Sequence, residues 1–113
     1  MRKIETDMIT VIKNQRDAVA LCEESRISKN LGNTQVTTGL REYGKVVTSV
    51  YLYGYLIAQG DAFTWSFKMC GFPTRTTKSR INALAFAFGR KGVNTKAGKH
   101  YSGKTEVNAY DWF

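Results

Sequence analysis

The stretch VVTSVYLYGYLIAQGDAFTWSFKMC, Val46–Cys70, decides the fold. Its first seven residues, Val46–Leu52, are rich in β-branched side chains and form the strongest β pattern in the chain. Gly54 predicts a tight turn into a second strand, and the turn residues 59–61 lead to a third. Large apolar residues alternate with polar ones over 63–70, which is typical of a half-buried strand.

The flanking segments predict the remaining elements. β-branched residues over 34–38 add a strand, so the sheet is expected at about 34–70. The preceding residues 25–33 are polar and end in a turn signal, Gly32-Asn33. Apolar residues at helical spacing predict helices over about 4–24 and 77–88. A glycine-rich basic loop over 90–104 and a C-terminal strand over 105–113 complete the chain.

This order predicts an α+β fold. We expect a single antiparallel sheet of four to five strands, covered on one face by two helices. The 113 residues suffice for one domain over 1–113 with a core of its own.

The positive charge of the chain is local. The net charge is +8, and one segment, 75–104, holds eight basic residues and no acidic one. They are Arg75, Lys78, Arg80, Arg90, Lys91, Lys96, Lys99 and Lys104. A basic block of this kind favours an anionic partner, above all the phosphates of a nucleic acid. The alternative is a solvated basic segment that only aids solubility.

Two candidate phosphate sites lie within this block. The first is the expected N-terminus of the second helix, where free backbone N–H groups attract anions. It would contact phosphates through Arg75, Lys78, Ser79 and Arg80. The alternative is a threonine-rich helix cap with exposed charges.

The second candidate is the glycine-rich loop. Its cations at intervals of a few residues suit a nucleic-acid backbone, and its tyrosine could stack on a base. The residues are Arg90, Lys91, Lys96, Lys99, Tyr101 and Lys104. The alternative is a loop without a partner.

Three further tyrosines, Tyr51, Tyr53 and Tyr55, flank the most hydrophobic strand. Tyr51 and Tyr53 would share one strand face. If exposed, they could stack on bases or form a protein contact, but packing beside the core is the favoured interpretation.

No catalytic or metal-ligating motif is present, so we expect no enzyme activity, no metal and no cofactor. Cys22 and Cys70 lie far apart, and His100 is the only histidine. No apolar run has the length of a signal peptide or of a membrane span, so we expect a soluble intracellular protein that does not bind membranes.

Several segments resemble small uncharacterised proteins encoded by tailed bacteriophages. The shared segments are Met8–Ile12, Gly32–Val36, Ser49–Ala58, Thr76–Leu84 and Trp112–Phe113, about half the chain. The relatives show an SVYLHGNLIA-like strand pair and a TTxSRLNALL-like helix start. The chain departs from them at Tyr53 and Tyr55, where they have His and Asn, and around 17–31 and 90–104, where it has longer inserts. The resemblance implies a phage protein of the host cell cytoplasm and supplies no activity or functional residue.

The function we expect is therefore non-enzymatic nucleic-acid binding, with DNA favoured over RNA. The alternative is a phage effector that binds and inhibits or redirects a host bacterial protein, because a basic surface also suits an acidic protein. A self-associating virion component is a third, weaker reading.

Overall fold

A computed structural model describes residues 2–21, 25–40, 44–61 and 64–113. The chain opens with helix α1 (Lys3–Ala20), and five strands and a second helix follow. The strands are β1 (Arg26–Leu31), β2 (Thr34–Leu40), β3 (Val46–Leu52), β4 (Tyr55–Gly60) and β5 (Trp65–Phe67). Helix α2 (Arg75–Ala87) precedes three short strands, β6 (Asn94–Lys96), β7 (Lys99–Ser102) and β8 (Thr105–Val107).

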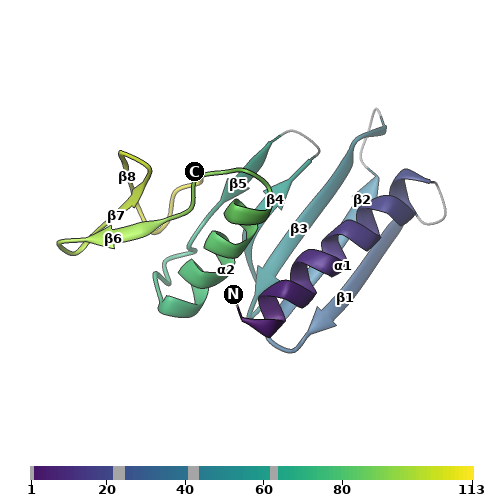
Figure 1. Cartoon of the computed structure of the whole chain (residues 1–113), viewed down its shortest axis with the longest axis horizontal. Coiled ribbons are helices and arrows are strands. Elements are labelled where there is room, and N and C mark those ends of the chain that lie inside the picture. The colour runs from purple at the N-terminus through teal and green to yellow at the C-terminus, as the bar shows by residue number, and fades with distance from the viewer. Residues whose placement is uncertain (1, 22–24, 41–43, 62–63) are drawn as a thin grey trace.

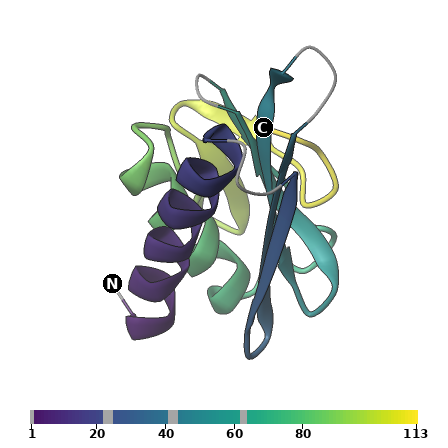
Figure 2. The same cartoon turned by 90° about the vertical axis from the view of Figure 1, so that its right-hand side faces the viewer.

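The first five strands form one antiparallel sheet in sequence order, β1 to β5 (Figure 1). This confirms the α+β class, the antiparallel pairing and the upper strand number. Figure 2 shows α1 and α2 on the same side of this sheet. A second sheet of order β6–β7–β8 stands at one end of the molecule, so the expectation of a single sheet is wrong.

Four segments differ from the sequence expectation. Helix α1 ends at Ala20, and residues 22–24 of the expected helix lie outside the described residues. The polar stretch before the turn at Gly32-Asn33, where no strand is expected, forms β1, an edge strand whose polar side chains face solvent, and the turn itself is present. The expected loop over 90–104 contains β6 and β7, and the final strand is only Thr105–Val107. Phe113 then pairs its backbone with Phe67 of β5 through two hydrogen bonds of 2.8 Å.

The core lies between the helices and the sheet. Its buried side chains come from α1, from alternate positions of the strands, from α2 and from the segment before β6. Among the largest are Met8, Ile12, Ile57, Phe67, Met69, Ile81 and Leu84. No helix of the described residues is long and apolar enough to cross a membrane.

A buried ion pair joins α1 to α2 within this core. The guanidinium of Arg80 donates from Nη1 to Oε2 of Glu5 at 2.7 Å, and both side chains are about 3% exposed. The hydroxyl of Ser79 donates to the same oxygen at 2.6 Å, and the backbone N–H of Arg2 donates to Oε1 at 3.2 Å. A second arm of Arg80, Nε, donates to the hydroxyl of Thr34 in β2 at 3.1 Å. The pair therefore connects both helices to the sheet.

The environment of Glu5 keeps it ionised. Burial alone raises the pKa of this carboxyl, but the hydrogen bonds from Ser79, Arg80 and the Arg2 backbone, with the charge of Arg80, outweigh it. The net result is a pKa below the ordinary value of 4.5.

A glycine in β4 leaves room for a tryptophan. A Cβ added to Gly60 would lie 2.2 Å from the ring of Trp65, which stacks on Phe88 at 4.6 Å between centroids. Gly60→Ala is therefore expected to lower the free energy of unfolding by about 1–3 kcal/mol in urea denaturation, as overpacking does. Gly39→Ala is the control, because its Cβ would meet atoms no closer than 3.7 Å. Equal stability of the two variants would contradict this packing.

Arg80→Met leaves the Glu5 carboxylate buried without its counter-charge. The expected loss is about 3–5 kcal/mol in the free energy of unfolding. The double variant Glu5→Met, Arg80→Met leaves no buried charge and is expected to lose less than the sum of the two single losses. A double variant whose loss equals that sum would show that the two side chains do not interact.

Glu5 also predicts how stability depends on pH. Because its pKa is lower in the folded than in the unfolded chain, its stabilisation is complete above about pH 4.5 and is lost as the pH falls through the folded pKa. The difference in unfolding free energy between the wild type and Glu5→Gln should therefore be constant near neutral pH and shrink in acid. If the difference in unfolding free energy between the two proteins does not change with pH down to about pH 3, Glu5 is not ionised in the folded protein.

Candidate nucleic-acid interface

The structure turns two of the expected phosphate-contacting residues inward. Arg80 is 2% exposed and donates to Glu5, Thr34 and Asn33, so its guanidinium does not face a ligand on the surface. Ser79 is half-buried and its hydroxyl also points to Glu5. The expectation that Arg80 contacts phosphate is therefore wrong, because this side chain joins the two helices instead. The hydroxyl hydrogen of Ser79 is used in its hydrogen bond to Glu5.

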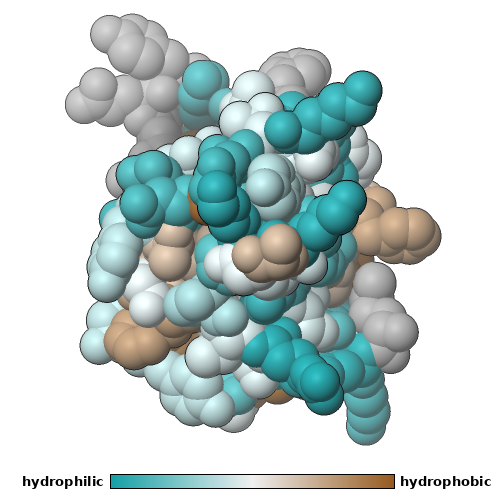
Figure 3. Space-filling view, turned by 90° about the vertical axis from the view of Figure 1, so that its left-hand side faces the viewer, coloured by the Kyte–Doolittle hydropathy of each residue, from teal (hydrophilic) through white to brown (hydrophobic). Residues whose placement is uncertain are grey.

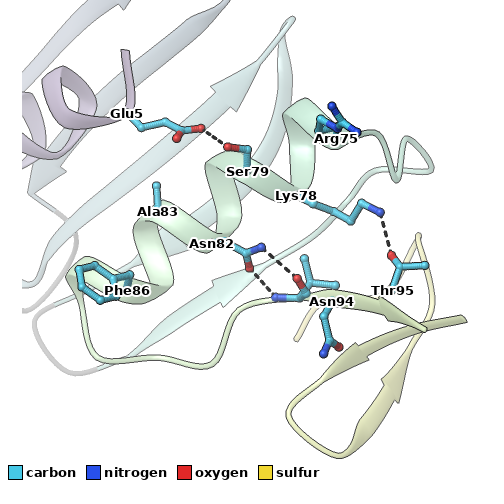
Figure 4. Close-up of a pocket in the computed structure, with 10 residues that line it drawn as sticks. Glu5, Arg75, Lys78, Ser79, Asn82, Ala83, Phe86, Asn94 and Thr95 are labelled. Carbon is cyan, nitrogen blue, oxygen red and sulfur yellow. Dashed lines mark hydrogen bonds between the residues drawn. The ribbon is translucent and has the colours of Figure 1, made fainter. Parts of the chain in front are cut away.

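Arg75, Lys78 and Ser79 all line an open groove, and Arg75 and Lys78 supply its positive charge. Arg75 and Lys78 line it from the first turn of α2, where Thr74 caps the helix by accepting the N–H of Thr77 at 3.2 Å. The groove measures about 660 Å³ and runs between α2 and β6 (Figure 4). Lys78 crosses it, its Nζ donating to the hydroxyl of Thr95 at 2.7 Å.

An asparagine holds the far wall of this groove in place. The side chain of Asn82 donates to the carbonyl of Val93 at 3.0 Å and accepts the N–H of the same residue at 2.7 Å. These bonds, visible in Figure 4, fix the start of β6 against α2. Sequence reasoning missed Asn82, Asn94 and Thr95 as groove residues. The available signal was the spacing of four between Lys78 and Asn82, which places both on one helix face.

The cations of the second candidate site separate into two groups. Lys96 and Lys99 lie opposite each other at the β6–β7 turn, where Ala97 and Gly98 have positive φ. Lys104 follows Gly103 in the β7–β8 turn. Arg90 and Lys91 instead line a separate hollow of about 370 Å³. The cations therefore do not share one cavity, but they all lie on α2, on the small sheet or on the link between them.

Tyr101 lies in the middle of β7, where it pairs with Asn94 on one side and Glu106 on the other. Tyr101 is half-buried, so only part of its ring is accessible for stacking on a base.

Among the upstream tyrosines, Tyr53 and Tyr55 are 69% and 51% exposed, so the expectation that they pack beside the core is wrong for both. Tyr53 also lies in the turn after β3 rather than on its face.

The seven cations of 75–104 other than Arg80 remain available on the surface. Lys78 is half-buried and the other six are exposed. In the described ranges, ion pairs join only Lys45 to Asp61 and Arg80 to Glu5, so none of the seven has an acidic partner there. Figure 3 looks onto the end formed by the small sheet and shows hydrophilic side chains over most of it, interrupted by separate hydrophobic residues.

The described residues contain no group of three or more His, Cys, Asp or Glu side chains that could hold a metal ion. Burial raises the pKa of the Cys70 thiol, and the nearby charge of Lys68 only partly offsets it. The neutral thiol is thereby favoured, which makes Cys70 a poor nucleophile. What the site offers is positive charge, hydrogen-bond donors and exposed aromatic rings.

Comparisons with known proteins give one result. The family model described as Kyanoviridae Gp96 protein matches residues 1–113. Neither the curated proteins nor the solved structures contain a match to the chain. The family match supports the phage origin that the resemblance implied, although it does not test the individual motifs quoted for it. The chain, matched over its full length, belongs to the Kyanoviridae Gp96 family of bacteriophage proteins.

Proposed function

We propose that this protein binds nucleic acid without catalysing a reaction, through the seven surface cations of 75–104. The observation that supports the proposal is their lack of acidic partners among the described residues. Cations that are not neutralised within the protein are free to displace the counterions of a phosphate backbone, which is the main source of affinity for nucleic acids.

The distribution of charge adds to this argument. All eight units of net charge come from 75–104, and the rest of the chain carries nine basic and nine acidic residues. The small sheet and α2, which carry these cations, lie together toward one end of the long axis (Figure 1). An approaching polyanion is therefore steered to that end rather than to the neutral part of the molecule.

The cations divide between a groove and a hairpin tip. Arg75 and Lys78 border a groove, whereas Lys96 and Lys99 project at a turn. We expect the groove to position one stretch of backbone and the hairpin to reach a neighbouring phosphate. DNA remains the favoured ligand over RNA, and no contact in the proposal depends on base sequence.

The test removes charge in matched pairs. Arg75→Ala with Lys78→Ala, and Lys96→Ala with Lys99→Ala, should each weaken binding of a labelled oligonucleotide and reduce the slope of log affinity against log salt by up to about 2. The control is Lys13→Ala with Lys29→Ala, which removes two exposed lysines of α1 and β1.

Thermal unfolding of each variant separates binding from folding. This check matters most for Lys78, whose loss also removes the bond to Thr95. If the control weakens binding as much as the other pairs, the effect belongs to net charge and the proposed surface is wrong.

An acidic host protein is the alternative partner, because the same unpaired cations would suit a carboxylate-rich surface. Capture from a bacterial lysate treated with nuclease distinguishes the two. A stoichiometric protein that stays bound after nuclease treatment, and is lost from Lys96→Ala with Lys99→Ala, would favour the alternative. Loss of all captured material on nuclease treatment would favour nucleic acid.

A further inference from the structure

A second cavity lies beside the first turn of α2, on the side away from the cationic groove. It measures about 280 Å³, and its floor includes the apolar side chains of Ile57 and Met69. Thr74 and Thr77 of α2 form one wall, next in sequence to Arg75 and Lys78 of the cationic groove. The same helical turn therefore separates a positively charged groove from an apolar pocket.

The rim of this pocket consists of exposed aromatic rings. Tyr53, Tyr55 and Phe72 are 69%, 51% and 50% exposed, and the rings of Tyr55 and Phe72 lie 5.1 Å apart at a tilt of 52°. Tyr55 and Phe72 contact each other, and the hydroxyl of Tyr53 accepts a hydrogen bond from the side chain of Asn33 at 3.2 Å, but at least half of each of the three residues remains exposed to solvent. A flat ring system could stack there while its polar edge stays in water.

Two strained turns hold this rim. Tyr53 has a φ of +51° and precedes Gly54 in the two-residue β3–β4 turn, and Cys70 has a φ of +55° before Gly71. A turn with positive φ at both central residues favours Asn-Gly, and a bulky residue at the first position is unfavourable. The strain at Tyr53 places its ring at the pocket, which points to a use for the ring beyond folding.

From these observations we propose that the protein binds single-stranded nucleic acid, with one unstacked nucleobase inserted into this aromatic pocket. The inference rests on the proposed function and specifies its ligand. The pocket is smaller than the roughly 300–1,000 Å³ typical of sites for drug-sized ligands, so it suits one flat ring system. The neighbouring cations Arg75 and Lys78 would hold the phosphates that flank the inserted base.

The pocket selects for a single strand because of how bases are presented. In a duplex each base is stacked and paired, so its ring faces cannot reach a pocket on the protein. In a single strand a base can leave the stack at low cost and rest on tyrosine or phenylalanine. A double helix could contact only the cations.

The first experiment compares a labelled oligothymidylate of about ten nucleotides with a duplex of the same length. The wild type should bind the single strand more tightly. Tyr55→Ala with Phe72→Ala should weaken single-strand binding about tenfold, leave duplex binding unchanged and leave the salt slope unchanged, because no cation is removed. Tyr51→Ala, on the opposite face of the sheet, is the matched control and should bind as the wild type.

A second variant separates the pocket from the fold. Tyr53→Asn places the favoured residue in the turn, so its Tm should rise by a few degrees. Its affinity for the oligothymidylate should fall nonetheless, because the stacking ring is gone. A more stable protein that binds less well cannot be explained by misfolding.

Three outcomes would overturn the inference. If single strand and duplex bind equally and the pocket variants bind both as the wild type does, the pocket has no role while the proposed function stands. If the wild type binds neither at low salt, the proposed function fails and the inference with it. If the pocket variants lose a protein partner but keep full affinity for the single strand, the pocket serves a protein side chain instead.

Discussion

The contact between Glu5 and Arg80 joins residues 75 positions apart and sets the direction in which α2 faces. A buried pair of this kind contributes little net stability compared with apolar residues, yet each partner requires the other because an isolated buried charge is very costly. With Arg80 directed to Glu5 and Thr34, the helical spacing directs Arg75, Lys78 and Asn82 toward the groove. The cationic groove therefore depends on an almost fully buried ion pair, whose carboxylate, Glu5, also forms part of the groove lining.

The sequence predicted those elements whose side chains repeat with a clear period. β3 is a run of β-branched residues, β5 alternates between buried and exposed positions, and α2 has an apolar stripe with a threonine cap. β1 was missed because its burial comes from two partly covered apolar residues among polar ones. β6 and β7 were missed because they are only three and four residues long and the turns that follow them contain Gly98 and Gly103. The charge pattern alone does not reveal the burial of Arg80, but its position along the helix does. Arg80 lies between Thr77 and Leu84 on the buried face of α2, as Glu5 lies beside Met8 on that of α1. A single acid and a single base on two apolar faces are the signal of a buried pair.

The first turn of α2 connects the two surfaces that carry the functional proposals. Its outward residues Arg75 and Lys78 supply charge to one groove, and its threonines border the aromatic pocket. The cations attract any polyanion. The pocket would add a preference for single strands, whose bases are free to stack on its rings, over duplexes. Neither surface requires a metal or a reactive side chain, and both are held by contacts made inside the protein, at Glu5 and at the two left-handed turns.

The salt dependence of binding by the unmodified protein tests the central claim most directly. If most of the seven surface cations contact phosphates, log affinity for an oligonucleotide should fall linearly with log salt, with a slope of about −4 to −6. A slope near zero, or no binding at low salt, would contradict a nucleic-acid-binding role for this surface.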